Sequence, residues 1–230
     1  VVAVSGPAAM KAAQGGDAYD HFCQDPRRKE LGWRGLRRAG LAGPAHDSEE
    51  APEALYHAAR RLTAVAEGAR DLPAEEALPL EGNLDMHHAI NFEKGCYLGQ
   101  ELTARTHFTG VVRKRVVPII AATDAAVDGA LPRALSHLPA WAHTAEAAAV
   151  LAGADSDEGL PVAADDEAYH DQEVVSAAGD ATAVGKARSG DSLGIGLALL
   201  RFERLGADGR VRLGGGDGRE HVAILPPWAA

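Results

Sequence analysis

The hydrophobic positions place one helix in the first half of the chain. Residues 52–68 carry apolar side chains at spacings of three and four, which predicts an amphipathic helix from Pro52 to about Gly68. These apolar positions are Leu55, Ala58, Ala59, Leu62, Val65 and Ala66. Arg60 and Arg61 fall on the opposite face, which the pattern alone predicts to be a solvated basic face.

Apolar and β-branched runs predict strands around this helix. Residues 1–4 form such a run, and the turn residues 25–27 lead into a strand that begins near Trp33, whose large ring we expect in the core. Residues 111–120 also have high β-propensity, although residues 113–115 are three successive cations. This triplet is either an anion-attracting patch or the charged protection of an edge strand.

The last third of the chain predicts a small antiparallel barrel. A hairpin is expected from residues 173–176 and 181–188. Three further strands are expected at residues 191–201, 211–213 and 221–225. Short strands at near-regular spacing with glycines between them favour a barrel. Before them, an alanine-rich acidic stretch at about 121–172 predicts a loop insertion, with a short helix at 142–151.

Composition narrows the class of protein. The 230 residues include 46% hydrophobic and 24% charged positions, as in ordinary globular proteins, and suffice for one large or two modest domains. A net charge of −10 argues against a nucleic-acid binder that acts through bulk electrostatics. Two cysteines, Cys23 and Cys96, are too few for a disulfide framework and favour a reducing compartment. We interpret Cys23 as incidental, and no apolar run is long enough to span a bilayer.

Candidate chemistry concentrates around Cys96. Gly95 and Gly99 flank it and are expected to hold the thiol out on a turn. Lys94, and Arg105 if the chain folds back, would favour the thiolate, which attacks electrophiles and binds metals. The alternative is that Cys96 is a small buried apolar residue of purely structural value.

Residues 94–101 read KGCYLGQE and resemble the KGCYxGQE signature of the YgfZ family, the folate-binding relatives of the glycine-cleavage T-protein that serve iron–sulfur cluster assembly. Residues 68–84 resemble the family's approach to this signature, and residues 25–34 its DPR and GWR segment. Residues 102–115 are more similar to the mitochondrial branch than to the bacterial one. The chain begins where the family is in mid-protein, so we expect an N-terminal region to be absent.

The resemblance implies an α+β protein with a partial T-protein (aminomethyltransferase)-like fold and a C-terminal antiparallel β-barrel. Residues 1–109 would be the C-terminal part of the folate-binding domain, including the signature. Residues 110–230 would be the barrel domain, interrupted by the acidic insertion.

The function implied by the resemblance is the maturation of [4Fe–4S] proteins together with A-type scaffold proteins. One alternative is a folate-dependent one-carbon (aminomethyl) transferase, and another is a non-catalytic interaction protein. We favour an assembly factor over a turnover enzyme because T-protein relatives lack the cysteine and folate transfer does not require a thiolate. The expected compartment is the mitochondrial matrix, with the bacterial cytoplasm as the alternative. Neither a membrane nor a nucleic acid is expected as a direct partner.

The implied site centres on the Cys96 thiolate, with Lys94, Gln100 and Glu101 beside it. An iron–sulfur cluster takes four protein ligands, so Cys96 would share a transient [2Fe–2S] or [4Fe–4S] cluster with a partner. The residues expected to bind tetrahydrofolate or a related folate are Tyr56, Arg60, Glu81, Asn83, Tyr97 and Arg105.

The spacing of Glu81 and Asn83 also favours a role in folate binding. Two residues apart on an extended segment, they would point the same way and offer a pterin edge both an acceptor and a donor. The adjacent His87 and His88 are poorly placed for joint metal ligation, and we interpret them as surface or turn residues.

Overall fold

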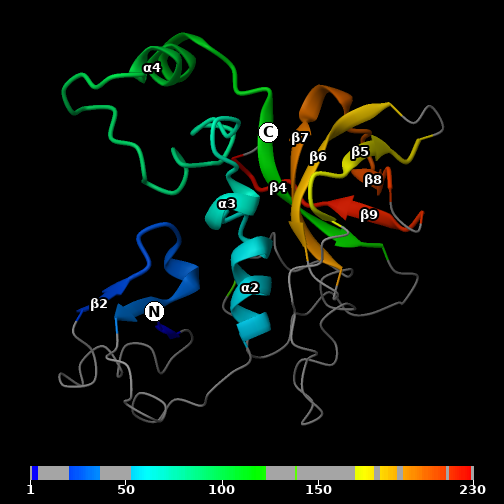
Figure 1. The fold of residues 1–230 in the computed structure, drawn as a ribbon, viewed down its shortest axis with the longest axis horizontal. Coiled ribbons are helices and arrows are strands. Elements are labelled where there is room, and N and C mark those ends of the chain that lie inside the picture. The colour runs from blue at the N-terminus through cyan, green and yellow to red at the C-terminus, as the bar shows by residue number, and fades with distance from the viewer. Residues whose placement is uncertain are drawn as a thin grey trace.

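The computed structural model describes residues 2–4, 21–36, 53–122, 138, 169–178, 182–190, 194–215 and 218–228. They form a small sheet with helices beside it and a closed barrel (Figure 1). None of the helices within these ranges is both long and apolar enough to cross a membrane.

The small sheet confirms the strands predicted near the start of the chain. It contains β1 (Val2–Val4), β2 (His21–Gln24) and β3 (Trp33–Leu36), antiparallel in the order β1-β3-β2. The predicted turn and the short 3-10 helix η1 (Lys29–Leu31) join β2 to β3. Trp33 is half-buried, so its ring is not in a core as expected.

The predicted amphipathic helix forms but ends earlier than expected. Helix α2 covers Glu53–Leu62 and is followed by the short α3 at Gly68–Asp71. Ala64 has a φ of 58°, and hydrogen bonds from Ala64 N to Arg61 O (2.8 Å) and from Val65 N to Arg60 O (2.8 Å) close a Schellman motif. This left-handed residue stops the helix before Gly68.

The barrel predicted for the C-terminal part is confirmed. Its strands are β4 (Lys114–Ala121), β5 (Glu173–Ser176), β6 (Ala183–Gly190), β7 (Ile195–Arg201), β8 (Arg210–Leu213) and β9 (Glu220–Ala223). They close in the order β4-β7-β6-β5-β8-β9, with every neighbouring pair antiparallel. β4 pairs with β7 along its length but with β9 only over residues 119–121, so among the described residues the end of β4 that carries the cations has a strand on one side only. The interpretation of these cations as protection of an edge strand stays a prediction.

The helices and the barrel share a hydrophobic core. The apolar stripe of α2 packs on one end of the barrel (Figure 1). The core formed there contains Leu31, Leu55, Ala58, Ala59, Leu62, Val65, Ile120, Leu138, Ile195 and Ile224. Residues before and after position 110 therefore stabilise each other.

The insertion is shorter than predicted within the described residues. Ala121 belongs to β4, where it pairs with His221, and Leu138 is buried in the core beneath α2. Tyr169 is 5% exposed inside the barrel core. The expected helix at 142–151 lies outside the described residues.

Two glycines make room for the Tyr169 ring. Gly190 of β6 and Gly196 of β7 are directly paired, and a Cβ at Gly190 would lie 2.2 Å from Cγ of the tyrosine. At Gly196 a Cβ would lie 2.8 Å from the same ring. The ring thus covers a glycine pair in the barrel wall, and its hydroxyl lies 3.0 Å from His221 Nε2.

We expect Gly190→Ala to lower the free energy of unfolding by about 1–3 kcal/mol, because the methyl group would overlap the Tyr169 ring and overpack the barrel. Urea denaturation followed by circular dichroism would measure the loss. Gly95→Ala is the control, since a Cβ there meets no atom within 4 Å. Equal stability of the two variants would contradict this account of the glycine pair.

Candidate functional site

Cys96 lies in an arm that leaves the body of the protein. We define the Cys96 arm as residues 86–113, which connect the turns after α3 to β4 and contain α4 (Gln100–Thr109). Figure 1 shows α4 far from both α2 and the barrel. Cys96 is a free, exposed thiol, which confirms that it is held out and not packed in a core.

A tight turn presents this thiol just before α4. Gly99 is the N-cap of the helix and has a φ of 85°, a left-handed conformation that glycine adopts without strain. The Gln100 side chain accepts a hydrogen bond from Tyr97 N at 3.3 Å and closes the turn. Gly95 has no positive φ, so only one of the two glycines is required by the backbone.

The charged residues near Cys96 in the sequence are Lys94, Glu101 and Arg105. The Lys94 ammonium lies 4.9 Å from the centroid of the Tyr97 ring. This cation–π contact joins a residue before Cys96 to the residue after it. Glu101 and Arg105 are both exposed on α4. Among the described residues, no hydrogen bond joins Cys96 to any of these side chains.

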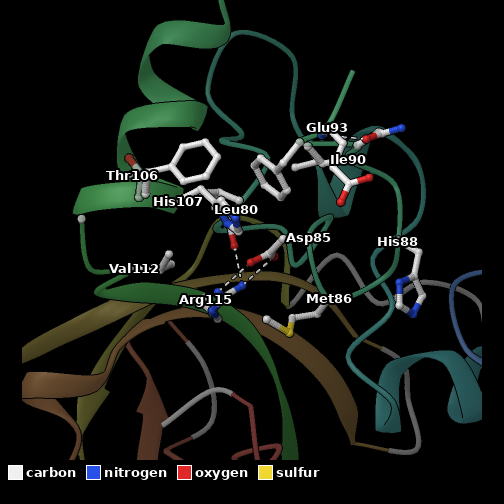
Figure 2. A pocket seen from close by; sticks show the side chains of 14 residues that line it. Leu80, Asp85, Met86, His88, Ile90, Glu93, Thr106, His107, Val112 and Arg115 are labelled. Atoms are coloured by element: carbon white, nitrogen blue, oxygen red, sulfur yellow. Dashed lines mark hydrogen bonds and ion pairs between the residues drawn. The ribbon is translucent and has the colours of Figure 1, made fainter. Parts of the chain in front are cut away.

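A cleft of about 870 Å³ lies between the arm and the barrel. Figure 2 shows Thr106 and His107 of α4 above the cleft and Arg115 at its base. His107 stacks on Phe92 with ring centroids 3.6 Å apart. The arm also exposes several large apolar side chains, namely Tyr97, Leu98, Leu102, Phe108 and Val111. Exposed apolar area of this kind is typical of a docking surface.

Arg115, which follows the arm, bonds to residues that precede it and so holds the two ends of the arm together at the barrel. Its guanidinium donates to Asp85 Oδ1 at 2.9 Å and Oδ2 at 3.0 Å, and also to Leu80 O at 2.8 Å (Figure 2). Lys114 pairs with Glu81 at 3.0 Å. Two of the three successive cations are therefore neutralised within the protein, and the predicted anion-attracting triplet is wrong.

Two residues expected to bind folate lie instead in a network of buried ions. The Tyr56 hydroxyl donates to Glu67 at 2.6 Å and accepts from Arg27 at 3.2 Å. Arg60 donates to Asp71 Oδ2 at 2.7 Å. Arg60 is 3% and Arg61 0% exposed, so the predicted solvated basic face is wrong.

The network joins distant segments and shifts the pKa values of its acids. Burial alone would raise the pKa of Asp25 and Glu67. Hydrogen bonds from Arg27 to Asp25, and from Tyr56 and Arg27 to Glu67, outweigh burial and lower the pKa of both. Asp71 also accepts a hydrogen bond from Ser189 of the barrel. Sequence reasoning did not single out these acids, although the DPR turn contains one of them.

The extended segment predicted for Glu81 and Asn83 is a series of turns. Asn83 has a φ of 63° and is fully buried. Its amide donates to Ala64 O at 3.2 Å and Val116 O at 2.7 Å, which ties the end of α2 to the barrel. His87 and His88, which we interpret as surface or turn residues, both lie in these turns; His87 is buried and His88 is exposed.

Of the six residues expected to bind folate, only Glu81 lines either of the two clefts described for this structure. Tyr56, Arg60 and Asn83 hold other parts of the protein, Glu81 pairs with a lysine, and Tyr97 and Arg105 are exposed on the arm. Folate binding by these residues stays a prediction. The described ranges also hold no group of three or more His, Cys, Asp or Glu that could bind a metal.

Comparisons with known proteins place these features in a family. The family model described as CAF17, C-terminal beta-barrel domain, matches residues 159–230. The human mitochondrial iron-sulfur cluster assembly factor IBA57 is 33% identical over 231 residues, which cover 97% of this chain and 51% of that protein. The chain belongs to the YgfZ/GcvT-like family.

Further members of this family support the assignment. The mouse IBA57 factor is 34% identical across 89% of this chain, and the IBA57 homologue of Mycosarcoma maydis is 50% identical across 41% of it. The chain covers 46% of the mouse protein and 24% of the fungal one. It thus spans about half the length of the mammalian members.

We expect the stability of this YgfZ/GcvT-like chain to fall as the pH drops below about 4, the ordinary carboxyl range. Asp25 and Glu67 have lowered pKa values in the folded state, so their contribution is present above the unfolded pKa and is lost as the pH falls through the folded pKa. Glu67→Gln should make this loss shallower and reduce stability at neutral pH by about 1–3 kcal/mol.

Urea denaturation at a series of pH values would test this expectation. Glu53→Gln is the matched control, because Glu53 is exposed at the start of α2. If both variants gave the parent's pH dependence, the ionic network would not be the source of acid sensitivity.

Proposed function

We propose that this chain acts in iron–sulfur cluster assembly by presenting Cys96 as one ligand of a cluster that it shares with an A-type scaffold protein. The observation that carries the proposal is the free, exposed thiol on a defined turn of a projecting arm. The relatives that match the chain are named as iron-sulfur cluster assembly factors. Their names also carry the word mitochondrial, and we place the activity in the mitochondrial matrix.

The ligand count explains why a partner is needed. A cluster takes four protein ligands, mainly thiolates. The second cysteine, Cys23, lies in β2 of the small sheet, whereas Cys96 lies on the arm. The partner would supply the remaining ligands, and the cluster is cargo held between two proteins.

The surroundings of Cys96 suit approach by a second protein. Leu98 is 100% exposed and Phe108 69% exposed, so the arm that carries the thiol offers apolar area for contact. The thiol must lose its proton to bind iron, and its exposure allows that proton to pass to solvent. The proposal includes no step through folate, because folate binding stays a prediction.

The proposal predicts that Cys96→Ser abolishes the shared cluster and leaves the fold intact. A cluster-loaded A-type scaffold would be mixed anaerobically with each variant, and the complex isolated for absorbance spectra and iron counting. Serine replaces an exposed sulfur that makes no described hydrogen bond, so stability should change by less than about 0.5 kcal/mol. Cys23→Ser is the matched control, since Cys23 is also free and exposed, and it should keep the cluster.

Three results would contradict the proposal. Iron and colour retained by the Cys96→Ser complex would exclude Cys96 as a ligand. Unfolding of Cys96→Ser, seen by circular dichroism, would show a structural role instead. A wild-type complex that forms without holding a cluster would favour the interaction-protein alternative.

A further inference from the structure

A second cluster of polar groups lies around Trp228 and includes His87, from the beginning of the Cys96 arm. Four buried nitrogen atoms there have no hydrogen-bond partner among the described residues: Arg28 Nε, Arg28 Nη2, His87 Nδ1 and Trp228 Nε1. The Arg28 guanidinium carbon lies 5.4 Å from the indole centroid, and the His87 ring centroid lies 6.1 Å from it. We call these three side chains the Trp228 site.

Unpartnered buried donors are rare in folded proteins and call for an explanation. The neighbouring Arg27 shows the usual arrangement, because it is paired with Asp25 and Glu67. Arg28 has no such carboxylate partner within the described ranges. Burial lowers the pKa of Arg28, and the negative charge of Glu30 partly opposes this shift without a direct contact.

The other positive groups near the indole do not change this picture. The Arg115 guanidinium carbon is 6.0 Å from the Trp228 centroid, but its charge is neutralised by Asp85. Within the described ranges, the positive charge of Arg28 is therefore left without a paired anion. An anionic group of suitable shape would be attracted to it.

His87 adds an acceptor to this set of donors. The side chain is 3% exposed, and Nε2 lies 3.0 Å from Ala64 O. A carbonyl oxygen only accepts, so Nε2 carries the proton and Nδ1 of the neutral ring is a hydrogen-bond acceptor. Burial is the main influence that lowers the pKa of His87 and favours the neutral ring, while hydrogen bonding to the carbonyls of Ala64 and Arg27 acts in the opposite direction.

We propose that the Trp228 site binds an oxyanion that also carries a hydroxyl group, such as hydrogen phosphate or a phosphate monoester. Its charged oxygens would accept hydrogen bonds from Arg28 and from the Trp228 indole. Its hydroxyl would donate to His87 Nδ1. A sulfate ion has the same shape and charge but no proton to donate at neutral pH, so it should bind more weakly.

The site would also link parts of the chain that are distant in sequence. Arg28 lies in the turn between β2 and β3, His87 in the turns after α3, and Trp228 beyond β9. An oxyanion bound by all three would stabilise the folded arrangement by mass action.

Isothermal titration of the full chain with sodium phosphate at neutral pH and fixed ionic strength would test the proposal. We expect saturable binding to one site. Arg28→Gln should weaken it by at least about tenfold, as expected for the loss of a charged hydrogen-bonding partner. Lys29→Gln is the matched control, because it removes an exposed positive charge from the same turn and should bind phosphate like the parent.

Trp228→Phe is the second variant, since it removes one N–H group and keeps an aromatic ring in place. It should bind phosphate more weakly while unfolding at a temperature close to the parent's, which guards against an Arg28 variant that fails to fold. Absence of phosphate binding by the parent would overturn the proposal. If sulfate bound as tightly as phosphate, the acceptor role of His87 would be overturned. If Lys29→Gln and Arg28→Gln lost phosphate affinity equally, the binding would be general charge attraction and not a specific site.

Discussion

The side chain of Asp71 connects the helices to the barrel. One of its oxygens accepts from Arg60 at 2.7 Å and from Glu67 N at 2.8 Å, and the other accepts from Ser189. A buried carboxylate is tolerated only when its charge is paired and its lone pairs are used. Each of these donors comes from a different place in the chain, so the carboxylate requires α2, α3 and β6 to meet in one arrangement.

A second set of contacts holds the two ends of the Cys96 arm. Asp85 precedes the arm and Arg115 follows it, and their paired hydrogen bonds hold the two ends together. Val116 N donates to Glu81 O at 2.8 Å and adds a main-chain link at the same place. The residues between are largely exposed. The contacts among Glu81, Asp85, Arg115 and Val116 therefore hold both ends of the arm, while the part that carries the thiol projects from the body of the protein.

Periodicity predicted the elements better than it predicted the partners of their polar residues. The barrel strands and the apolar stripe of α2 follow from local patterns, and the exposure of Cys96 follows from its glycine-flanked motif. Arg60 was misjudged because a helical pattern shows which face is polar but not that Asp71 covers it. Asn83 was misjudged because its left-handed backbone replaces the extended geometry on which the argument depended.

The number of cluster ligands that a protein supplies also bears on the proposed function. Four thiolates in one protein would hold a cluster as a resident group, since every ligand would have to be displaced before it left. A single exposed thiolate contributes one bond in four and leaves the remaining bonds to the partner. A cluster shared in this way would lose only one of its four ligands when the two proteins separate. The projecting position of Cys96 is thus better matched to transfer than to storage.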